Sequence, residues 1–467
     1  MIRKDIGGND MLKSEKSEAL TKKFMEMYPG GHSQLRVPMD VTNHRLFIDR
    51  AKGSHLFDVD GNEYIEYNGA LGPNILGYCV PEWTEKLKEY LDKCGTAIGS
   101  NLLFSPYDIE IAERLRKYIP CCEQVKFTMT GSDCVQAAFR IMRGVTGRQV
   151  IIRFEKHYSG WYDNVLGGRC QKDPNARPTT DFSSEGLPEG YEYNTLGRSK
   201  YAGEEVFMLP WNDFDALERT FEKYHDEIAG VHFEAVVANN EMLYPKEGYL
   251  EKIRELCTKY GAIMSIDEVI TGFRVDIGGA QKMFNVTPDI CTIGKALSNG
   301  FPVACIAGKK EVMDKIRSKI LVPGTYSGWA FGQCASVATL DILAKDNFAC
   351  YDKRNAVQEV LMNGLVDCAT RHDIPLAITE APGMFYTVFG VEGGRSRFYT
   401  EEDIANFKPE MVKVFQQYLQ EQGIFIMFGG KWYISMSHSE EDIAKTLEAV
   451  DVAMKKMHDN DMKFVAE

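Results

Sequence analysis

The sequence predicts an α/β protein with a large, mostly parallel sheet and a second, smaller α+β domain. Between about residues 124 and 310, short apolar runs alternate with segments of helical periodicity. Strands separated by helices indicate crossover connections, which join parallel neighbours. The predicted strands of this region are 125–129, 150–154, 206–209, 230–233, 262–266 and 290–293.

The N-terminal part is expected to form one helix and a strand meander. Residues 10–28 are charged with a weak apolar side, and Pro29-Gly30-Gly31 ends that helix. Asp60-Gly61-Asn62 separates two short strand-like runs, 56–59 and 64–67, as a hairpin turn does. Amphipathic helices are predicted next, over 82–95 and 107–118.

The last third is expected to be the smaller domain. Residues 376–390 and 424–436 supply its strands. Its first helix is predicted to run from just after Gly332 to about residue 344. Further helices are predicted over 350–370, 408–422 and 440–458. The resulting division is an N-terminal segment (1–75) that joins the small domain, a large domain (76–332) and the C-terminal small domain (333–467).

Composition excludes several classes of protein. The 467 residues are 44% hydrophobic and 26% charged, which is typical of globular chains and not of disordered or fibrous ones. The net charge of −13 argues against nucleic-acid or anionic-membrane partners, which require clustered Lys and Arg. No apolar run is long enough to span a membrane, and the N-terminus lacks a signal-peptide core. The 12 cysteines form no C-x-x-C pair, so zinc spacing is absent and reduced cysteines in a cytoplasmic protein are expected.

The strongest chemical signal lies between residues 265 and 297. Asp267 ends an apolar strand, and Lys295 follows the next one. Ligands of open α/β sheets bind at the carboxyl ends of the strands. A lysine there can form a Schiff base, and an aspartate can hold a pyridinium nitrogen, so the pair suits pyridoxal phosphate. The alternative is an exposed lysine and a helix-capping aspartate.

Three further segments could complete such a site. After the strand ending at Thr130, Gly131 turns the chain and Ser132 can cap the next helix, whose N-terminus could bind phosphate. An aromatic residue in 154–161 could stack on a flat ring. The glycines and hydroxyls of 323–328 suit an anion. The alternatives are an ordinary capped helix, a satisfied surface or core residue at His157, and a turn. The long insert 168–204 has no clear period, and such loops are often functional.

In this order and spacing, the segments resemble the class III (fold type I) pyridoxal phosphate-dependent aminotransferases, in particular the subgroup of glutamate-1-semialdehyde 2,1-aminomutase. The resemblance covers about residues 28–457, and its most specific block runs from Asp267-Glu268 to Gly294-Lys295. It implies a seven-stranded sheet in the large domain, pyridoxal 5′-phosphate as cofactor, and a homodimer with active sites at the subunit interface.

The resemblance also implies the catalytic residues. Lys295 would hold the cofactor as an aldimine and shuttle the substrate proton. Asp267 would pair with the ring nitrogen. Tyr158 and Val269 would lie on opposite faces of the ring.

The phosphate and substrate contacts follow in the same way. Gly131 and Ser132 would bind the phosphate, and Thr325 would reach the phosphate of the neighbouring subunit. Arg36 lies where the family holds a substrate carboxylate, for which a guanidinium is well suited. Its alternative role is an ion pair with a nearby Asp or Glu.

The departures from the family fall on the substrate side. The acidic residue that the aminomutase carries shortly before its final Ser-x-x-His has no counterpart in 429–433. Ala70-Leu71 replaces Ser-Trp, and Ser159 replaces a histidine. These differences predict an aminotransferase that uses an amino-acid donor and another carbonyl acceptor. The alternatives are an aminomutase, a racemase or epimerase, an elimination lyase, and a non-catalytic binding module. Cys134, near the expected phosphate, is predicted to be the cysteine open to modification.

Overall fold

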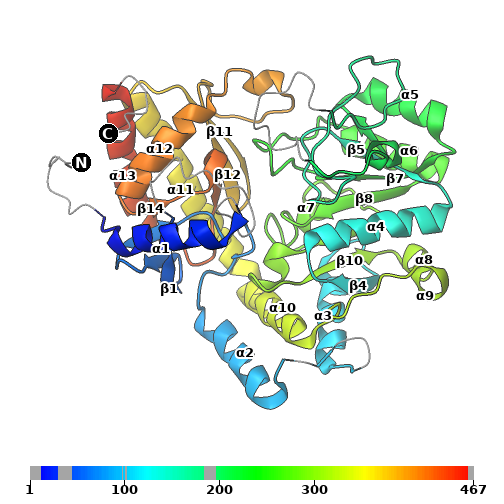
Figure 1. Ribbon diagram of the computed structural model, residues 1–467, viewed down its shortest axis with the longest axis horizontal. Coiled ribbons are helices and arrows are strands. Elements are labelled where there is room, and N and C mark those ends of the chain that lie inside the picture. The colour runs from blue at the N-terminus through cyan, green and yellow to red at the C-terminus, as the bar shows by residue number, and fades with distance from the viewer. Residues whose placement is uncertain (1–11, 30–44, 97, 100–102, 184–195, 461–467) are drawn as a thin grey trace.

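The computed structural model describes residues 12–29, 45–96, 98–99, 103–183 and 196–460. Figure 1 shows two lobes side by side, with the central helices α4 and α10 on the side of the larger sheet. The lobe opposite contains both the N-terminal helix α1 and the C-terminal helix α13.

The larger lobe is built on a seven-stranded sheet of order β4-β10-β9-β8-β7-β5-β6. All neighbours are parallel except β10, which runs antiparallel to β4 and to β9. The predicted mostly parallel sheet is therefore confirmed, and β10 is the one strand absent from the six predicted apolar runs. The strands are β4 (Gln124–Thr128), β5 (Val150–Phe154), β6 (Val206–Leu209), β7 (Ile228–Phe233), β8 (Ile263–Glu268), β9 (Ile290–Ile293) and β10 (Ala304–Gly308).

Helices connect these strands and cover the sheet. The helix after β4 packs its apolar side inward, because Val135, Ala138, Phe139 and Met142 of α4 are all buried. The helices are α2 (Pro81–Cys94), α3 (Pro106–Tyr118), α4 (Gly131–Thr146), α5 (Phe214–Tyr224), α6 (Tyr249–Tyr260), α7 (Gly279–Met283), α8 (Lys310–Met313), α9 (Ile316–Lys319) and α10 (Ala330–Leu343), with 3-10 turns η2 (Ala202–Glu205) and η3 (Lys295–Ser298).

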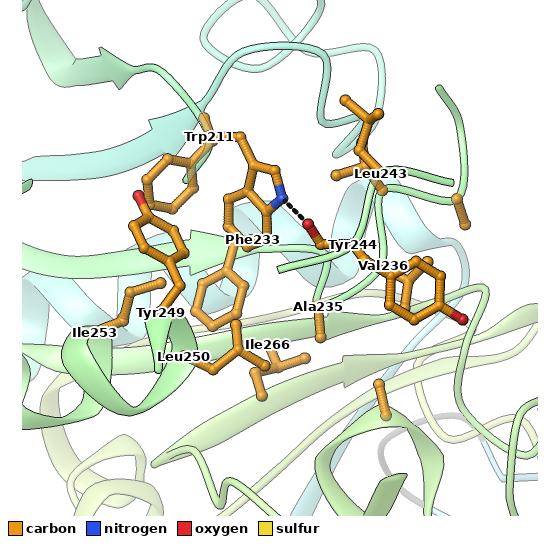
Figure 2. Close-up of a cluster of buried hydrophobic side chains, with 14 of the residues drawn as sticks. Trp211, Phe233, Ala235, Val236, Leu243, Tyr244, Tyr249, Leu250, Ile253 and Ile266 are labelled. Atoms are coloured by element: carbon orange, nitrogen blue, oxygen red, sulfur yellow. Dashed lines mark hydrogen bonds between the residues drawn. The ribbon is translucent and has the colours of Figure 1, made fainter. Parts of the chain in front are cut away.

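An aromatic core fixes the loop that leaves β7. Figure 2 shows Trp211, Phe233 and Tyr249 packed together, with Leu250 of α6 beside Ile266 of β8. The Trp211 indole N–H donates to the Tyr244 carbonyl oxygen at 3.2 Å. Burial of such large side chains stabilises each by roughly 1.5–3 kcal/mol. The end of β7 and the loop after it are thereby held in place, and both contribute to the site.

The smaller lobe combines both ends of the chain. In its first sheet, of order β1-β2-β3-β14, strand β14 pairs parallel with β3 across more than 350 residues of sequence. The second sheet has the order β13-β11-β12-β15. The hairpin predicted at residues 60–62 is confirmed, because β2 and β3 pair antiparallel around it.

The strands of this lobe are β1 (Ile48–Lys52), β2 (His55–Asp58), β3 (Glu63–Glu66), β11 (Leu376–Ala381), β12 (Met384–Phe389), β13 (Gly394–Arg395), β14 (Ile424–Phe425) and β15 (Lys431–Tyr433). Its helices are α1 (Glu15–Met27), α11 (Ala349–Arg371), α12 (Pro409–Glu421) and α13 (Glu440–Asp459), with 3-10 turns η4 (Lys345–Phe348), η5 (Glu402–Ile404) and η6 (Phe428–Gly430). The domain limits 1–75, 76–332 and 333–467 stay a prediction, and the last limit falls inside α10.

The described part of the 168–204 insert folds back on the edge of the large sheet. Thr179 forms an antiparallel bridge with Phe207 of β6, and Arg169 forms one with Asp181. The same two side chains make an ion pair at 2.7 Å. Within the described ranges, no helix is both long and apolar enough to cross a membrane.

Candidate active site

The candidate site lies at the carboxyl ends of three neighbouring strands of the large sheet. Glu234 follows β7, Asp267 lies near the end of β8, and Lys295 follows β9. Because β7, β8 and β9 pair in parallel, their carboxyl ends meet at one edge of the sheet. The structure thus brings together Asp267 and Lys295, as the sequence predicts.

The Asp267 carboxylate is buried and held by three donors. Its Oδ1 accepts from the Thr292 hydroxyl and the Val269 backbone N–H, both at 3.0 Å. Its Oδ2 lies 3.2 Å from His232 Nε2, and His232 Nδ1 lies 2.9 Å from the Ser265 hydroxyl. A neutral imidazole satisfies both contacts when Nε2 donates to Asp267 and Nδ1 accepts from Ser265. The carboxylate is therefore fixed in orientation before any ligand arrives.

His232 was missed by the sequence reasoning. The signal was a histidine inside an apolar strand, two residues before Glu234 and hence on the same face of β7. Its contact with Asp267 depends on the register of β7 against β8, in which His232 pairs with Ser265.

Lys295 occupies a strained backbone position. Its φ of 45° lies in the left-handed region, which a residue with a Cβ rarely adopts. Burial lowers the pKa of its ammonium, and the positive charge of Lys431 lowers it further, against the opposing effects of Tyr433, Glu234 and Asp267. A lysine with a lowered pKa is more often neutral, which is the form needed for nucleophilic attack and for accepting a proton.

The N-terminus of α4 differs from the prediction in one respect. The helix begins at Gly131, and its cap is Thr130 rather than Ser132. The Thr130 hydroxyl accepts from the Asp133 backbone N–H, and the Asp133 carboxylate accepts from the Thr130 N–H, as in a capping box. Ser132 instead lies in the first turn, where its hydroxyl is not required for capping.

Small residues keep the space around that helix end narrow. A Cβ on Gly131 would lie 3.1 Å from Val269 Cγ1, and one on Gly160 would lie 2.6 Å from Ser132 Oγ. Gly131, Ser132 and Val269 therefore gather at one place, as the sequence predicts. The N–H groups of a helix N-terminus favour an anion such as phosphate.

Tyr158 is tied to the site through its backbone. Its N–H donates to Glu234 Oε1 at 2.9 Å, and its side chain is 36% exposed. The preceding His157 is buried, and its Nδ1 accepts from the Glu234 N–H at 3.0 Å, whereas its Nε2 has no hydrogen-bond partner among the described residues. Stacking of the Tyr158 ring on a cofactor stays a prediction.

Two of the predicted residues are not tested by the structure. Arg36 lies outside the described residues. Thr325 is exposed on the segment between α9 and α10, and its reach to a neighbouring subunit stays a prediction.

The expectation for Cys134 is wrong. This thiol is fully buried in α4, and burial raises its pKa well above the ordinary value, as does the charge of Asp267. Cys79 is the exposed cysteine of the described part of the chain. Cys134 is only two residues from Ser132 in the sequence, but its side chain lies on the buried side of α4.

A second polar group, also missed by the sequence reasoning, lies beside Lys295. Glu234 accepts from three N–H donors: Tyr158 N, Ala238 N and Asn239 Nδ2. Lys431 of β15 lies with its Nζ 3.2 Å from the Tyr433 hydroxyl and 3.4 Å from Asn239 Oδ1. Burial raises the pKa of Glu234 and lowers that of Lys431. Such perturbed groups in one place are typical of functional sites.

Comparison with known proteins agrees with this geometry. The family model described as aminotransferase class III matches residues 37–454. A protein of Staphylococcus saprophyticus named glutamate-1-semialdehyde 2,1-aminomutase 2 is 35% identical over 448 residues, which cover 94% of this chain and 99% of that protein. One of Staphylococcus aureus named glutamate-1-semialdehyde 2,1-aminomutase 1 is 34% identical over 455 residues, with 95% and 99% covered.

Two solved structures show the same fold. An omega-transaminase from Sphaerobacter thermophilus has a TM-score of 0.81 at 23% identity, covering 94% of this chain and 97% of its own. A glutamate-1-semialdehyde aminomutase from Pseudomonas aeruginosa PAO1 also has a TM-score of 0.81, at 18% identity, covering 95% and 94%.

The residues present fit pyridoxal phosphate. A buried, oriented Asp267 suits its ring nitrogen, the glycine-lined start of α4 suits its phosphate, and Lys295 has the lowered pKa that attachment requires. The strand-end pair that the sequence singled out thus lies near a helix N-terminus that would suit a phosphate. The chain belongs to the class III aminotransferases, a family of enzymes that depend on pyridoxal phosphate.

Proposed function

We propose that the protein is an aminotransferase that moves an amino group from an amino-acid donor to a carbonyl acceptor. The observation that carries this proposal is Lys431, which is buried and whose charge acts on Lys295. The segment around it is the one in which the resembled aminomutase carries an acidic residue. A positive charge in place of a negative one alters which substrate groups can bind there. The residues predicted to hold the cofactor keep the family pattern.

The residues have separate tasks in this reaction. Bound pyridoxal phosphate supplies an electron sink that makes the proton on the amine-bearing carbon removable. Lys295 Nζ would take up that proton and deliver it to carbon C4′ of the cofactor, for which its lowered pKa is suitable. Asp267 balances the positive charge of the ring nitrogen, and His232 holds Asp267 in place. The α4 N-terminus anchors the phosphate, so that the substrate carbon stays within reach of Lys295.

The second candidate is an aminomutase. Two curated relatives at 34–35% identity carry that name, which favours it. In that reaction the amine leaves and returns within one molecule, so no free keto acid is formed.

An experiment with the loaded enzyme and single substrates separates the candidates. With an amino-acid donor alone, mass spectrometry should detect one keto acid per site together with pyridoxamine phosphate. Lys295→Ala should show neither product nor the visible band of lysine-bound cofactor, whereas Lys246→Ala, at an exposed lysine of the loop after β7, should behave as the parent. Conversion of glutamate-1-semialdehyde alone into its isomer, without a keto acid from any donor, would establish the aminomutase instead. Release of free ammonia, or exchange of the carbon-bound proton alone, would contradict both.

We further infer a homodimer whose interface includes the start of α3 and of α10. Gln333 Nε2 donates to Asp108 Oδ1 at 2.8 Å and links these two helix ends. Large apolar side chains are exposed next to these helix ends along the chain: Leu103 and Phe104 before α3, Ile109 within it, and Tyr326 before α10. Exposed apolar patches of this kind are typical of association surfaces. Light scattering should give twice the mass of the chain, and Thr325→Ala should weaken cofactor binding if this surface completes the neighbour's phosphate site.

The cytoplasmic location stays a prediction.

A further inference from the structure

The ammonium of Lys431 has a hydrogen-bonding capacity that its surroundings do not use. The side chain is 1% exposed, so solvent does not satisfy it. Its hydrogen-bond partners within the described residues are two neutral oxygens, the Tyr433 hydroxyl at 3.2 Å and the Asn239 amide at 3.4 Å, and the centroid of the Tyr386 ring lies 5.2 Å from Nζ. An ammonium has three N–H donors and no acceptor. One donor is therefore left over in a place where an unpaired charge is costly.

The nearby carboxylates do not serve as its ion-pair partners. Glu234 already accepts from three N–H groups, two of them from the backbone. Its charge and that of Glu241 act on Lys431 from a distance, while Arg274 opposes them. Within the described part of the chain, Lys431 takes part in no ion pair shorter than 4 Å. The arrangement thus leaves a position for one further anion.

This position lies on the substrate side of Lys295. The charge of Lys431 lowers the pKa of Lys295, whereas Tyr433 raises it and also contacts Lys431 through its hydroxyl. Gly72 packs against the Tyr433 ring, since a Cβ there would lie 3.0 Å from Cζ, and its carbonyl accepts from Arg274. The Tyr433 ring is therefore held in one position, and so is its hydroxyl, which orients Lys431.

We propose that Lys431 Nζ binds a carboxylate of the substrate, with the Tyr433 hydroxyl and Asn239 as its orienting partners. The proposal rests on the proposed amine-transfer function and makes Lys431 a specificity-determining residue. Substrates that carry a carboxylate able to reach β15 are favoured over simple amines and aldehydes. A hydrogen bond to a charged group of this kind is worth about tenfold to hundredfold in binding.

Binding of the carboxylate should be accompanied by proton uptake. Burial lowers the pKa of Lys431, so part of the population is neutral near pH 7, and an arriving anion favours the charged form. The titratable and charged groups that face Lys431 come from several elements, namely Glu234 after β7, Glu241 in the following loop, Arg274 after β8, Lys295 after β9, Tyr386 on β12 and Tyr433 on β15.

The test uses the loaded enzyme and glutarate, a dicarboxylate without an amine or carbonyl group. Calorimetry of the parent should show glutarate binding with a heat that depends on the ionisation enthalpy of the buffer. Lys431→Met should keep the cofactor band but lose roughly ten- to hundredfold in glutarate affinity, together with the buffer dependence. Lys431→Arg should restore part of the affinity, and Lys246→Met should match the parent.

Substrate kinetics give the second readout. Lys431→Met should raise the apparent KM for a carboxylate-bearing amine and leave that for the same amine without the carboxylate unchanged. Equal effects on both amines, or unchanged glutarate binding in Lys431→Met, would overturn the proposal. If the parent binds glutarate through Lys431 but transfers no amine, the proposed function fails while the carboxylate site stands.

Discussion

His232→Phe should weaken both the fold and the cofactor site, because this ring joins Asp267 to Ser265. Phenylalanine retains a ring of similar size against Phe139, whose centroid lies 5.4 Å from that of His232. It removes the donor to Asp267 and leaves the Ser265 hydroxyl without its partner. A buried hydrogen bond to an ionised group is worth about 1.5–3 kcal/mol, and an unsatisfied buried hydroxyl costs about 1–3 kcal/mol. We expect the free energy of unfolding to fall by about 3 kcal/mol.

The cofactor provides the specific readout. Asp267 keeps the two contacts to its Oδ1, so pyridoxal phosphate should still bind, but about tenfold to hundredfold more weakly, since about 1.4 kcal/mol corresponds to tenfold. Urea unfolding gives the stability, and the absorbance of the loaded enzyme against pH reports the state of the cofactor. Ser265→Ala is the matched control, because it keeps the bond from His232 Nε2 to Asp267 and should cost only about 1 kcal/mol. The reasoning is refuted if His232→Phe is destabilised while cofactor affinity and the pH dependence of its absorbance equal those of the parent.

Three other predictions concern the helix cap, acid stability and the thiols. Thr130→Ala should lower the free energy of unfolding by about 1 kcal/mol as a lost cap, whereas Ser132→Ala should leave stability within about 0.5 kcal/mol and weaken cofactor binding, as denaturation and titration would show. Burial lowers the pKa of His438 to about 4 from 6.5, so the unfolded chain binds this proton first as pH falls. Relative to His438→Gln, the parent should therefore lose about 3 kcal/mol of stability between pH 6.5 and 4 and no more below, and equal losses would contradict this. Under native conditions a thiol reagent should modify Cys79 first and spare Cys134, which peptide mapping can check.

Much of the large sheet could be predicted because all of its strands except β4 are buried on both faces. Such strands are continuous apolar runs of four to six residues, and all six predicted runs correspond to β-strands. The antiparallel strand β10, Ala304–Gly308, was not recognised. Its run of small residues lacks the β-branched and aromatic enrichment that marks a strand, and only its place between β4 and β9 defines it.

The candidate site could be predicted where a single segment carries the signal. Asp267 and Lys295 could each be recognised from one local segment, an apolar strand with a polar residue at its end. Lys431 and Glu234 are separated by almost 200 residues, and the perturbed pKa of each arises from burial by segments far away in the sequence. No local pattern could show that these two groups share a site.

The sequence by itself determined the order of strands and helices, the polar residues at strand ends and, through their spacing, the family. Those features depend on neighbours along the chain, where periodicity and capping act. Only the tertiary structure decided which residues support them: the register of β7 on β8 places His232 against Asp267, and β15 brings Lys431 to Lys295. Hydrogen bonding, burial and charge act through space, so they depend on contacts that form only when distant segments pack together.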